Sequence, residues 1–227
     1  ELMDPDRRIT MVSLVPTMLA RLLDAGLERP PTLRWALVGG GPIPLRLLER
    51  AAESGVPVAP TYGMTEGCSQ LFTFGLPLPG VEFSFQGPDR ELLVRGPMVA
   101  PGSLDETGWL HTGDLGRLDE HGRLEIVGRQ SDTIITGGEN VAPQEVETTL
   151  ITHPAVADAA VIGRPDPEWG QRVVALVVGD GDVAPDPEQL RAHCRERLAG
   201  FKVPKEVEFV DHLPRSNSGK LLRRELR

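Results

Sequence analysis

The run Thr61-Tyr62-Gly63-Met64-Thr65-Glu66 places three kinds of reactive side chain in one short segment. The ring of Tyr62 offers a face on which a planar base can stack. The hydroxyls of Thr61 and Thr65 can donate hydrogen bonds to phosphate oxygens, and the carboxylate of Glu66 can hold a divalent cation. The run is a candidate nucleotide site; the simpler alternative is a loop whose hydroxyls cap the next helix.

A glycine-rich segment, Gly39-Gly40-Gly41-Pro42, follows the apolar run Trp35-Ala36-Leu37-Val38. Glycine has no Cβ, so a planar group or a phosphate can approach the backbone closely at such a segment. Glycine is also the default residue wherever the chain bends, and a plain turn therefore remains the alternative.

Three later segments carry polar residues that suit the same chemistry. Thr112-Gly113-Asp114 supplies a carboxylate that can accept two ribose hydroxyls. Gly128-Arg129-Gln130-Ser131-Asp132 joins an arginine to small polar residues at a point where a hinge is expected. Ser218-Gly219-Lys220 ends in a lysine, a point charge suited to a developing carboxylate or phosphate charge. Taken singly, a turn aspartate and a solvated lysine are the simpler interpretations.

A βαβ unit is predicted to bring the first two segments together. Apolar residues at 35–38 and 56–59 indicate strands, and the periodicity of Pro44 to Ser54 indicates a helix between them. A helical crossover of this length makes the strands parallel, so their carboxyl ends share one edge of the sheet. Open α/β sheets bind ligands at that edge. An earlier helix is predicted from Pro16 to Gly26.

The rest of the chain has a different pattern. From Leu76 to Val127, short alternating segments separated by turns predict a small antiparallel, barrel-like part, with a hairpin turn at Asp119-Glu120-His121-Gly122. Beyond it we expect strands at 156–162, 173–178 and 206–210, and helices at 143–153 and after the N-cap Asp186. The predicted fold class is thus α/β followed by α+β.

The predicted domain organisation follows from these changes of pattern. Residues 1–128 form one domain, with a βαβ sheet part at 1–75 and a β-barrel-like part at 76–128. Residues 129–132 are the hinge, and residues 133–227 form a smaller α+β domain.

Composition excludes several classes of protein. The net charge of -9 over 227 residues argues against a general nucleic-acid binder. No apolar stretch approaches the roughly 20 residues of a membrane helix, and two cysteines are too few for a disulfide framework. We expect a cytoplasmic protein without a membrane span. The chain opens directly in structured-looking sequence, so we also expect it to be part of something longer.

In this order, five motifs resemble those of the AMP-forming acyl-CoA synthetases, adenylation domains and luciferases. They are Gly39-Gly40-Gly41-Pro42, the run from Thr61 to Glu66, Thr112-Gly113-Asp114-Leu115, Gly128 to Asp132 with Gly137-Gly138-Glu139-Asn140, and Ser218-Gly219-Lys220. Residues 62–70 and 131–140 are similar to those of the o-succinylbenzoate-CoA ligases of menaquinone biosynthesis. The resemblance covers nearly the whole chain.

This resemblance implies a two-step ligase. A carboxylic acid attacks the α-phosphate of ATP, with Mg²⁺, to give an acyl adenylate, and the thiol of coenzyme A then displaces AMP. The roles it implies are nucleotide binding at Gly40, Gly41, Pro42, Thr61, Tyr62, Gly63, Asp114 and Arg129; catalysis at Thr65, Glu66 and Lys220, with Glu66 holding the metal; acyl contacts at Gly67, Ser69 and Gln70; a hinge at Ser131; and CoA contacts at Gly137, Gly138, Glu139, Lys202 and Lys205.

One departure from the family pattern keeps alternatives open. The Ser/Thr/Gly-rich loop ending in Pro-Lys-Gly, which wraps the outer phosphates in the family, is missing from these residues. We therefore expect apolar sheet faces that promote homo-oligomer formation or pairing with an N-terminal portion. A non-catalytic nucleotide-binding remnant is the alternative function, and a carrier protein is the alternative acceptor.

Overall fold

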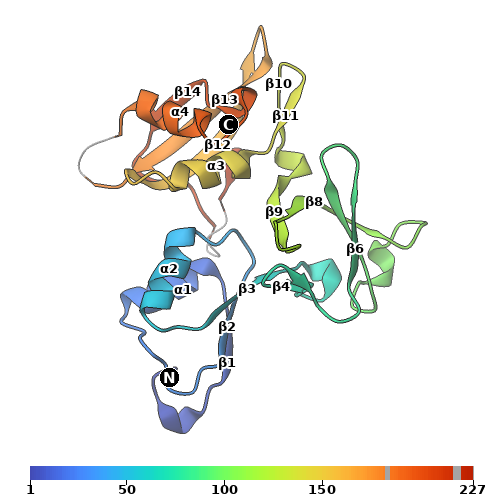
Figure 1. The fold of residues 1–227 in the computed structure, drawn as a ribbon, viewed down its shortest axis with the longest axis vertical. Coiled ribbons are helices and arrows are strands. Elements are labelled where there is room, and N and C mark those ends of the chain that lie inside the picture. The colour runs from blue at the N-terminus through green and yellow to red at the C-terminus, as the bar shows by residue number, and fades with distance from the viewer. Residues whose placement is uncertain (182–184, 217–220, 227) are drawn as a thin grey trace.

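The computed structural model describes residues 1–181, 185–216 and 221–226, and its strands form three sheets (Figure 1). The first sheet has the order β1-β2-β3-β4-β5. Its strands are β1 (Met11–Leu14), β2 (Trp35–Val38), β3 (Val58–Tyr62), β4 (Phe72–Thr73) and β5 (Leu76–Pro77). β1, β2 and β3 are parallel, which confirms the predicted βαβ unit, while β4 and β5 continue the sheet in antiparallel fashion.

Two helices, α1 (Pro16–Asp24) and α2 (Leu45–Glu53), lie side by side on one face of this sheet (Figure 1). α1 starts with proline in its first turn, as predicted, and Gly26 follows it with φ +84°. Their apolar side chains pack against Ala36 and Val38 of β2. The opposite face carries Met11 and Trp35, which are 58% and 40% exposed.

The second sheet is a purely antiparallel meander of β6 (Glu82–Gln86), β7 (Glu91–Arg95), β8 (Leu110–Leu118) and β9 (Leu124–Arg129). The antiparallel prediction is confirmed, but the described strands form an open sheet, with β6 and β9 at its edges, instead of a closed barrel. The predicted hairpin turn joins β8 to β9, and the Asp119 carboxylate accepts the backbone N–H groups of His121 and Arg123.

The third sheet runs β11-β10-β13-β12, with β14 parallel to β13. Its strands are β10 (Ile134–Thr136), β11 (Glu139–Val141), β12 (Val156–Asp166), β13 (Gly170–Gly179) and β14 (Glu206–Phe209), and its helices are α3 (Pro143–Ile151) and α4 (Pro187–Arg195). Asp186 caps α4 as predicted, accepting the Glu188 N–H at 3.0 Å. Val146, Leu150 and Leu190 of the helices bury the face of β12 and β13.

Short 3-10 turns connect these elements. They are η1 (Pro5–Arg7), η2 (Thr65–Gly67), η3 (Pro101–Ser103), η4 (Gln130–Asp132), η5 (Gly200–Lys202) and η6 (Arg223–Glu225). Among the helices that the structure describes, none has the length and apolar character needed to cross a lipid bilayer.

A substitution at Leu150 tests how tightly the helices pack on the third sheet. The side chain is fully buried, so Leu150→Ala should lower the free energy of unfolding by about 2–5 kcal/mol. Ile135→Ala, at a position that is 57% exposed, is the control and should change it by no more than about 0.5 kcal/mol. Urea titration followed by circular dichroism measures both, and equal midpoints for the two variants would contradict this packing.

Candidate functional site

The carboxyl ends of β2 and β3 meet closely, as the parallel pairing requires. A Cβ at Gly39 would lie 2.3 Å from the Thr61 Oγ1 atom and 2.8 Å from the Thr61 carbonyl oxygen, so only glycine fits there. The Thr61 hydroxyl donates to the Val38 carbonyl at 3.2 Å. The glycine segment and the Thr61 run are therefore neighbours, but the Thr61 proton is already engaged within the protein. Gly40, Gly41 and Pro42 are exposed beyond it.

The loop after Tyr62 folds back on itself. A Cβ at Gly63 would stand 1.8 Å from the Ser69 carbonyl oxygen, which makes this chain crossing possible only with glycine. Cys68 and Ser69 both adopt left-handed backbone conformations, with φ of 52° and 83°. The loop holds Thr65 and Glu66 exposed in η2. The N-cap of η2 is Met64, without a side-chain capping bond, so the helix-capping interpretation does not describe this loop.

The predicted acyl residues lie along the same loop. Gly67 is buried, and a Cβ there would be 2.8 Å from the Leu71 side chain. The backbone of Ser69 packs on Gly63 while its side chain belongs to an exposed residue. The Gln70 amide donates to the Thr73 hydroxyl on β4.

Tyr62, Asp114 and Arg129 converge from three strands. The Tyr62 hydroxyl donates to Asp114 Oδ2 at 2.8 Å, and Arg129 Nε donates to Asp114 Oδ1 at 2.6 Å. Asp114 and Arg129 face each other in the β8–β9 register, which explains their ion pair. Asp114 is buried at 5% exposure, whereas the Arg129 side chain is 57% exposed. A carboxylate has about four lone-pair positions, so Asp114 can still accept two ligand hydroxyls.

Burial and the Asp114 charge shape the protonation of this cluster. Burial raises the pKa of Tyr62 far above its ordinary value, and the neighbouring Asp114 carboxylate raises it further. The hydrogen bond to Asp114 raises the pKa of Arg129. At neutral pH the cluster is thus a neutral phenol and a guanidinium held on one carboxylate.

The predicted hinge and CoA segments lie beside and beyond this cluster. Ser131 is exposed in η4, two residues after Arg129. Gly137 and Gly138, with φ of 59° and 84°, form the predicted tight turn, which joins β10 to β11. In Figure 1 this hairpin points away from the end of β3, so the structure does not bring it to Tyr62.

The two described lysines near the hairpin have partners. Lys202 donates to both oxygens of Glu145, at 2.9 and 2.7 Å, so its charge is used within the protein. The Lys205 ammonium lies 5.0 Å from the centre of the Trp169 ring, which itself packs on Gly137. Trp169 is 42% exposed, and no pattern in the sequence singled it out.

Glu139 is exposed on β11. Lys220, with Ser218 and Gly219, lies outside the described residues. Among the described residues, no group of three or more His, Cys, Asp or Glu side chains is arranged to hold a metal ion.

Comparison with known proteins identifies the family. The sequence profile of the AMP-binding enzymes matches residues 5–104, and that of the AMP-binding enzyme C-terminal domain matches residues 145–220. The first profile includes the motifs at 39–42 and 61–66, the second includes the motif at 218–220, and the motifs at 112–115 and 128–140 lie between the two matched ranges. The chain belongs to the AMP-binding enzyme family.

Individual relatives include acid-CoA ligases. A 2-succinylbenzoate-CoA ligase of Bacillus cereus (strain Q1) is 43% identical over 97% of the chain, which spans about half (52%) of that relative's length. The Bacillus subtilis o-succinylbenzoate CoA synthetase, solved with the acyl-adenylate intermediate, is 41% identical with a TM-score of 0.80, covering 97% of this chain and 51% of its own. An amide bond synthetase of Marinactinospora thermotolerans gives a TM-score of 0.88 at 33% identity, covering 98% and 53%.

Tyr62 is the chain's single tyrosine, so alkaline titration of tyrosinate absorbance reports this side chain alone. We expect Tyr62 to stay protonated well above its ordinary pKa of 10.0 while the chain is folded. Because the folded state then holds a proton that the unfolded state releases, stability is unaffected below pH 10.0 and falls as the pH rises above it.

Asp114→Asn removes the charge that opposes tyrosinate, and it should lower the Tyr62 pKa in the folded protein. Glu125→Gln, which removes an exposed carboxylate from β9, should leave the pKa unchanged. Identical titrations of both variants and the parent would show that Asp114 does not act on Tyr62.

Proposed function

We propose that this chain takes part in an ATP-dependent acid-thiol ligase reaction on o-succinylbenzoate, a step of menaquinone biosynthesis. The arrangement that carries the proposal is the Asp114 carboxylate, which Tyr62 and Arg129 hold at the edge where the strands bring the glycine loop. Identities of 41–43% with proteins named for this reaction support the choice of acid.

In the first step a carboxylate oxygen of the acid attacks the α-phosphorus of ATP, and pyrophosphate leaves. Phosphoryl chemistry of this kind needs positioning and charge neutralisation more than covalent catalysis. Gly40, Gly41 and Pro42 would lie along the adenine, with Tyr62 stacked on it next to Gly63 and Thr61. Asp114 and Arg129 would hold the ribose hydroxyls. Thr65 would contact the α-phosphate, and Lys220 would bridge it to the acyl carboxylate.

A magnesium ion fits the donor set only with help from the nucleotide. Mg²⁺ is commonly bound through one or two carboxylates together with substrate phosphates. Glu66 is an exposed carboxylate beside Thr65, and no larger group of ligating side chains occurs in the part of the chain that the structure describes. Glu66 would therefore hold the ion, which neutralises phosphate charge when bound.

In the second step the sulfur of coenzyme A attacks the carbonyl carbon of the mixed anhydride, and AMP leaves. Gly67, Ser69 and Gln70 would contact the acyl group. Gly137, Gly138, Glu139, Lys202 and Lys205 would contact CoA, and Lys202 would do so while paired with Glu145. Because the hairpin points away from Tyr62, residues 133–227 would turn about a hinge at 129–132, around Ser131, relative to residues 1–128.

The acceptor is a thiol in this proposal, although the amide bond synthetase has the higher TM-score. The TM-score compares backbones, while the choice of acceptor depends on side chains, so we follow the higher sequence identity of the ligases. Both cysteines are free thiols, which suits a cytoplasmic enzyme.

The test uses a preformed o-succinylbenzoyl adenylate, so that it does not depend on ATP use. Mixing the chain with this adenylate and CoA should give the CoA thioester above the uncatalysed rate, detected by mass spectrometry. Asp114→Ala should slow thioester formation by about tenfold to a hundredfold, the effect of losing charged hydrogen bonds to the ribose.

Asp24→Ala is the matched control, because Asp24 is an exposed carboxylate paired with Arg50 on the helices. It should react like the parent. No thioester from any adenylate in a panel, with the chain shown to be folded, would favour a nucleotide-binding remnant. Formation of amides with added amines but no thioester would move the acceptor assignment to amines.

The exposed face of the first sheet is suited to contact another polypeptide. Met11 and Trp35 lie in register on β1 and β2, and Phe74 packs edge-to-face on Trp35 at 5.5 Å. Contiguous exposed apolar side chains mark protein contacts. We propose that this face packs on a second copy of the chain or on an N-terminal portion of the kind expected from the family resemblance.

Sedimentation velocity tests this surface on the isolated chain. We expect concentration-dependent association, and the double variant Met11→Gln/Trp35→Gln should reduce it because it removes apolar contact area. Leu118→Gln, at a residue 41% exposed on β8, is the control and should associate like the parent. A monomeric parent at all concentrations would refute self-association through this face.

A further inference from the structure

Arg46 makes an unusual set of contacts. It lies in the first turn of α2, yet its guanidinium reaches residues more than a hundred positions later in the chain. Nη1 donates to Asp180 Oδ2 at 2.8 Å, and Nη2 donates to the carbonyl oxygens of His153 and Pro154 at 3.3 and 3.2 Å. All three acceptors belong to the part of the chain after the proposed hinge.

Helix electrostatics do not explain an arginine at this position. The first turn of a helix carries partial positive charge, so a cation there is unfavourable for α2 itself. The surroundings of the acceptors, in contrast, favour a cation. The carbonyls of His153 and Pro154 follow the carboxyl end of α3, where the helix dipole is negative, and the Asp180 carboxylate follows β13. The charge of Arg46 therefore suits the junction between the two parts and not its own helix.

Further contacts across this junction lie elsewhere among the described residues. Asn140 donates to Asp89 Oδ1 at 2.8 Å, and Gly128 lies against Ala142 so closely that a Cβ would be 2.9 Å away. Parts joined by a limited and polar interface are expected to move relative to each other. A contact with three acceptors can then decide which arrangement is populated.

We propose that Arg46 is a clasp that holds residues 133–227 in the observed arrangement, and that it must open before the Gly137-Gly138 hairpin can reach an acyl adenylate. The second half of this inference rests on the proposed function. Arg46 is a positioning residue: it touches no substrate, and it acts by selecting one orientation of the part that carries the hairpin.

Arg50 provides a matched control on the same helix. It lies four positions further along α2, has a similar side-chain exposure of 48% against 42% for Arg46, and donates to Asp24 Oδ1 at 2.6 Å. Asp24 belongs to α1, so this ion pair stays within the first part of the chain. Arg46→Ala and Arg50→Ala thus remove the same side chain and one ion pair each, but only Arg46→Ala opens the junction.

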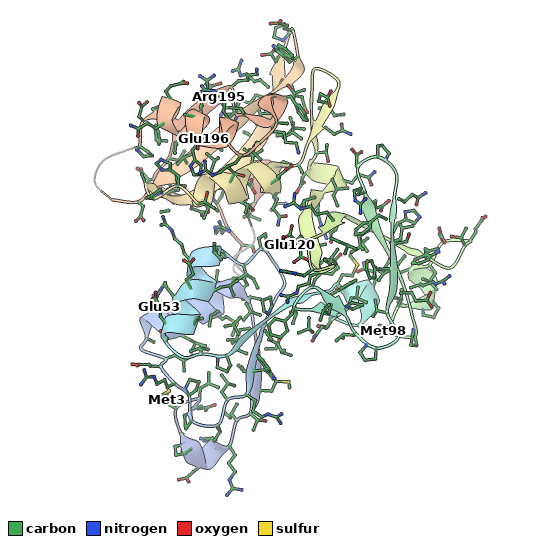
Figure 2. All side chains as sticks on the ribbon, viewed as in Figure 1. Met3, Glu53, Met98, Glu120, Arg195 and Glu196 are labelled. Carbon is green, nitrogen blue, oxygen red and sulfur yellow. The ribbon has the colours of Figure 1, made fainter. Side chains whose placement is uncertain are left out.

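Spin-label distances read out the arrangement directly. Labels at Glu53→Cys on α2 and Glu196→Cys after α4, in a Cys68→Ser background, report the two parts, and Figure 2 shows both positions. The remaining Cys194 is buried, and burial raises its thiol pKa to about 11, so it does not compete for the label.

The expected result is one main distance in the parent and in Arg50→Ala. Arg46→Ala should lower the ratio of that population to the others by about threefold, the effect of losing an exposed ion pair with its carbonyl contacts. Asp180→Asn should shift the ratio in the same direction. Thioester formation from preformed adenylate should rise by about threefold in Arg46→Ala, should also rise in Asp180→Asn, and should stay unchanged in Arg50→Ala.

Different outcomes separate the clasp from the proposed function. Unchanged distances in Arg46→Ala, or equal shifts in Arg46→Ala and Arg50→Ala, would overturn the clasp even if the parent makes thioester. A distance shift confined to Arg46→Ala and Asp180→Asn would support the clasp, and it would do so even if no variant makes thioester and the ligase proposal fails.

Discussion

The rest of the site depends on the hydrogen bonds that the Asp114 carboxylate accepts from Tyr62 and Arg129. This carboxylate is buried, and a buried carboxylate is costly unless hydrogen bonds and a counter-charge compensate it. Arg129 supplies the charge from the neighbouring strand, and Tyr62 supplies a hydroxyl from the first sheet. The same three residues thereby fix the first sheet against the second. The Asp114 carboxylate, which would bind the ribose, thus also holds the end of β3 and its exposed loop in place.

Parts of this arrangement were predictable because their signals are local. A helix between two apolar runs implies parallel strands and hence a shared edge, and the close approach of Gly39 to Thr61 is the outcome. The capped start of α4 and the tight turn at Gly137 likewise depend on a few adjacent residues. Four-residue β1 was missed, since Met11-Val12-Ser13-Leu14 is too short to show a period.

Other parts depend on contacts between distant residues, and no local pattern encodes them. The Tyr62 hydroxyl meets Asp114 from 52 positions away, and Lys202 meets Glu145 from 57. The family resemblance implied a CoA contact for Lys202. Its pairing with Glu145 follows only once η5 packs near α3. Trp169 was missed for the same reason, because its place beside Gly137 exists only in the folded sheet.

A second buried carboxylate, that of Glu147, ties the residue that ends the proposed hinge to the part of the chain after it. Glu147 on α3 accepts both Nη atoms of Arg223, at 2.6 and 2.8 Å, together with the Val161 N–H at 2.7 Å. The Nε atom of Arg223 lies 3.3 Å from Asp132 Oδ2, at the end of η4. Asp132 is therefore tied to the C-terminal core.

On the other side of the same turn, Arg129 is tied to Asp114 and so to the second sheet. Two residues, Gln130 and Ser131, separate these anchors, and both are exposed. A rotation between the two parts would concentrate in the backbone of these residues, since bending elsewhere would break a compensated buried charge. The proposed hinge at Ser131 is thus where bending disturbs the fewest interactions, and the Arg46 contact is what such a rotation would have to release.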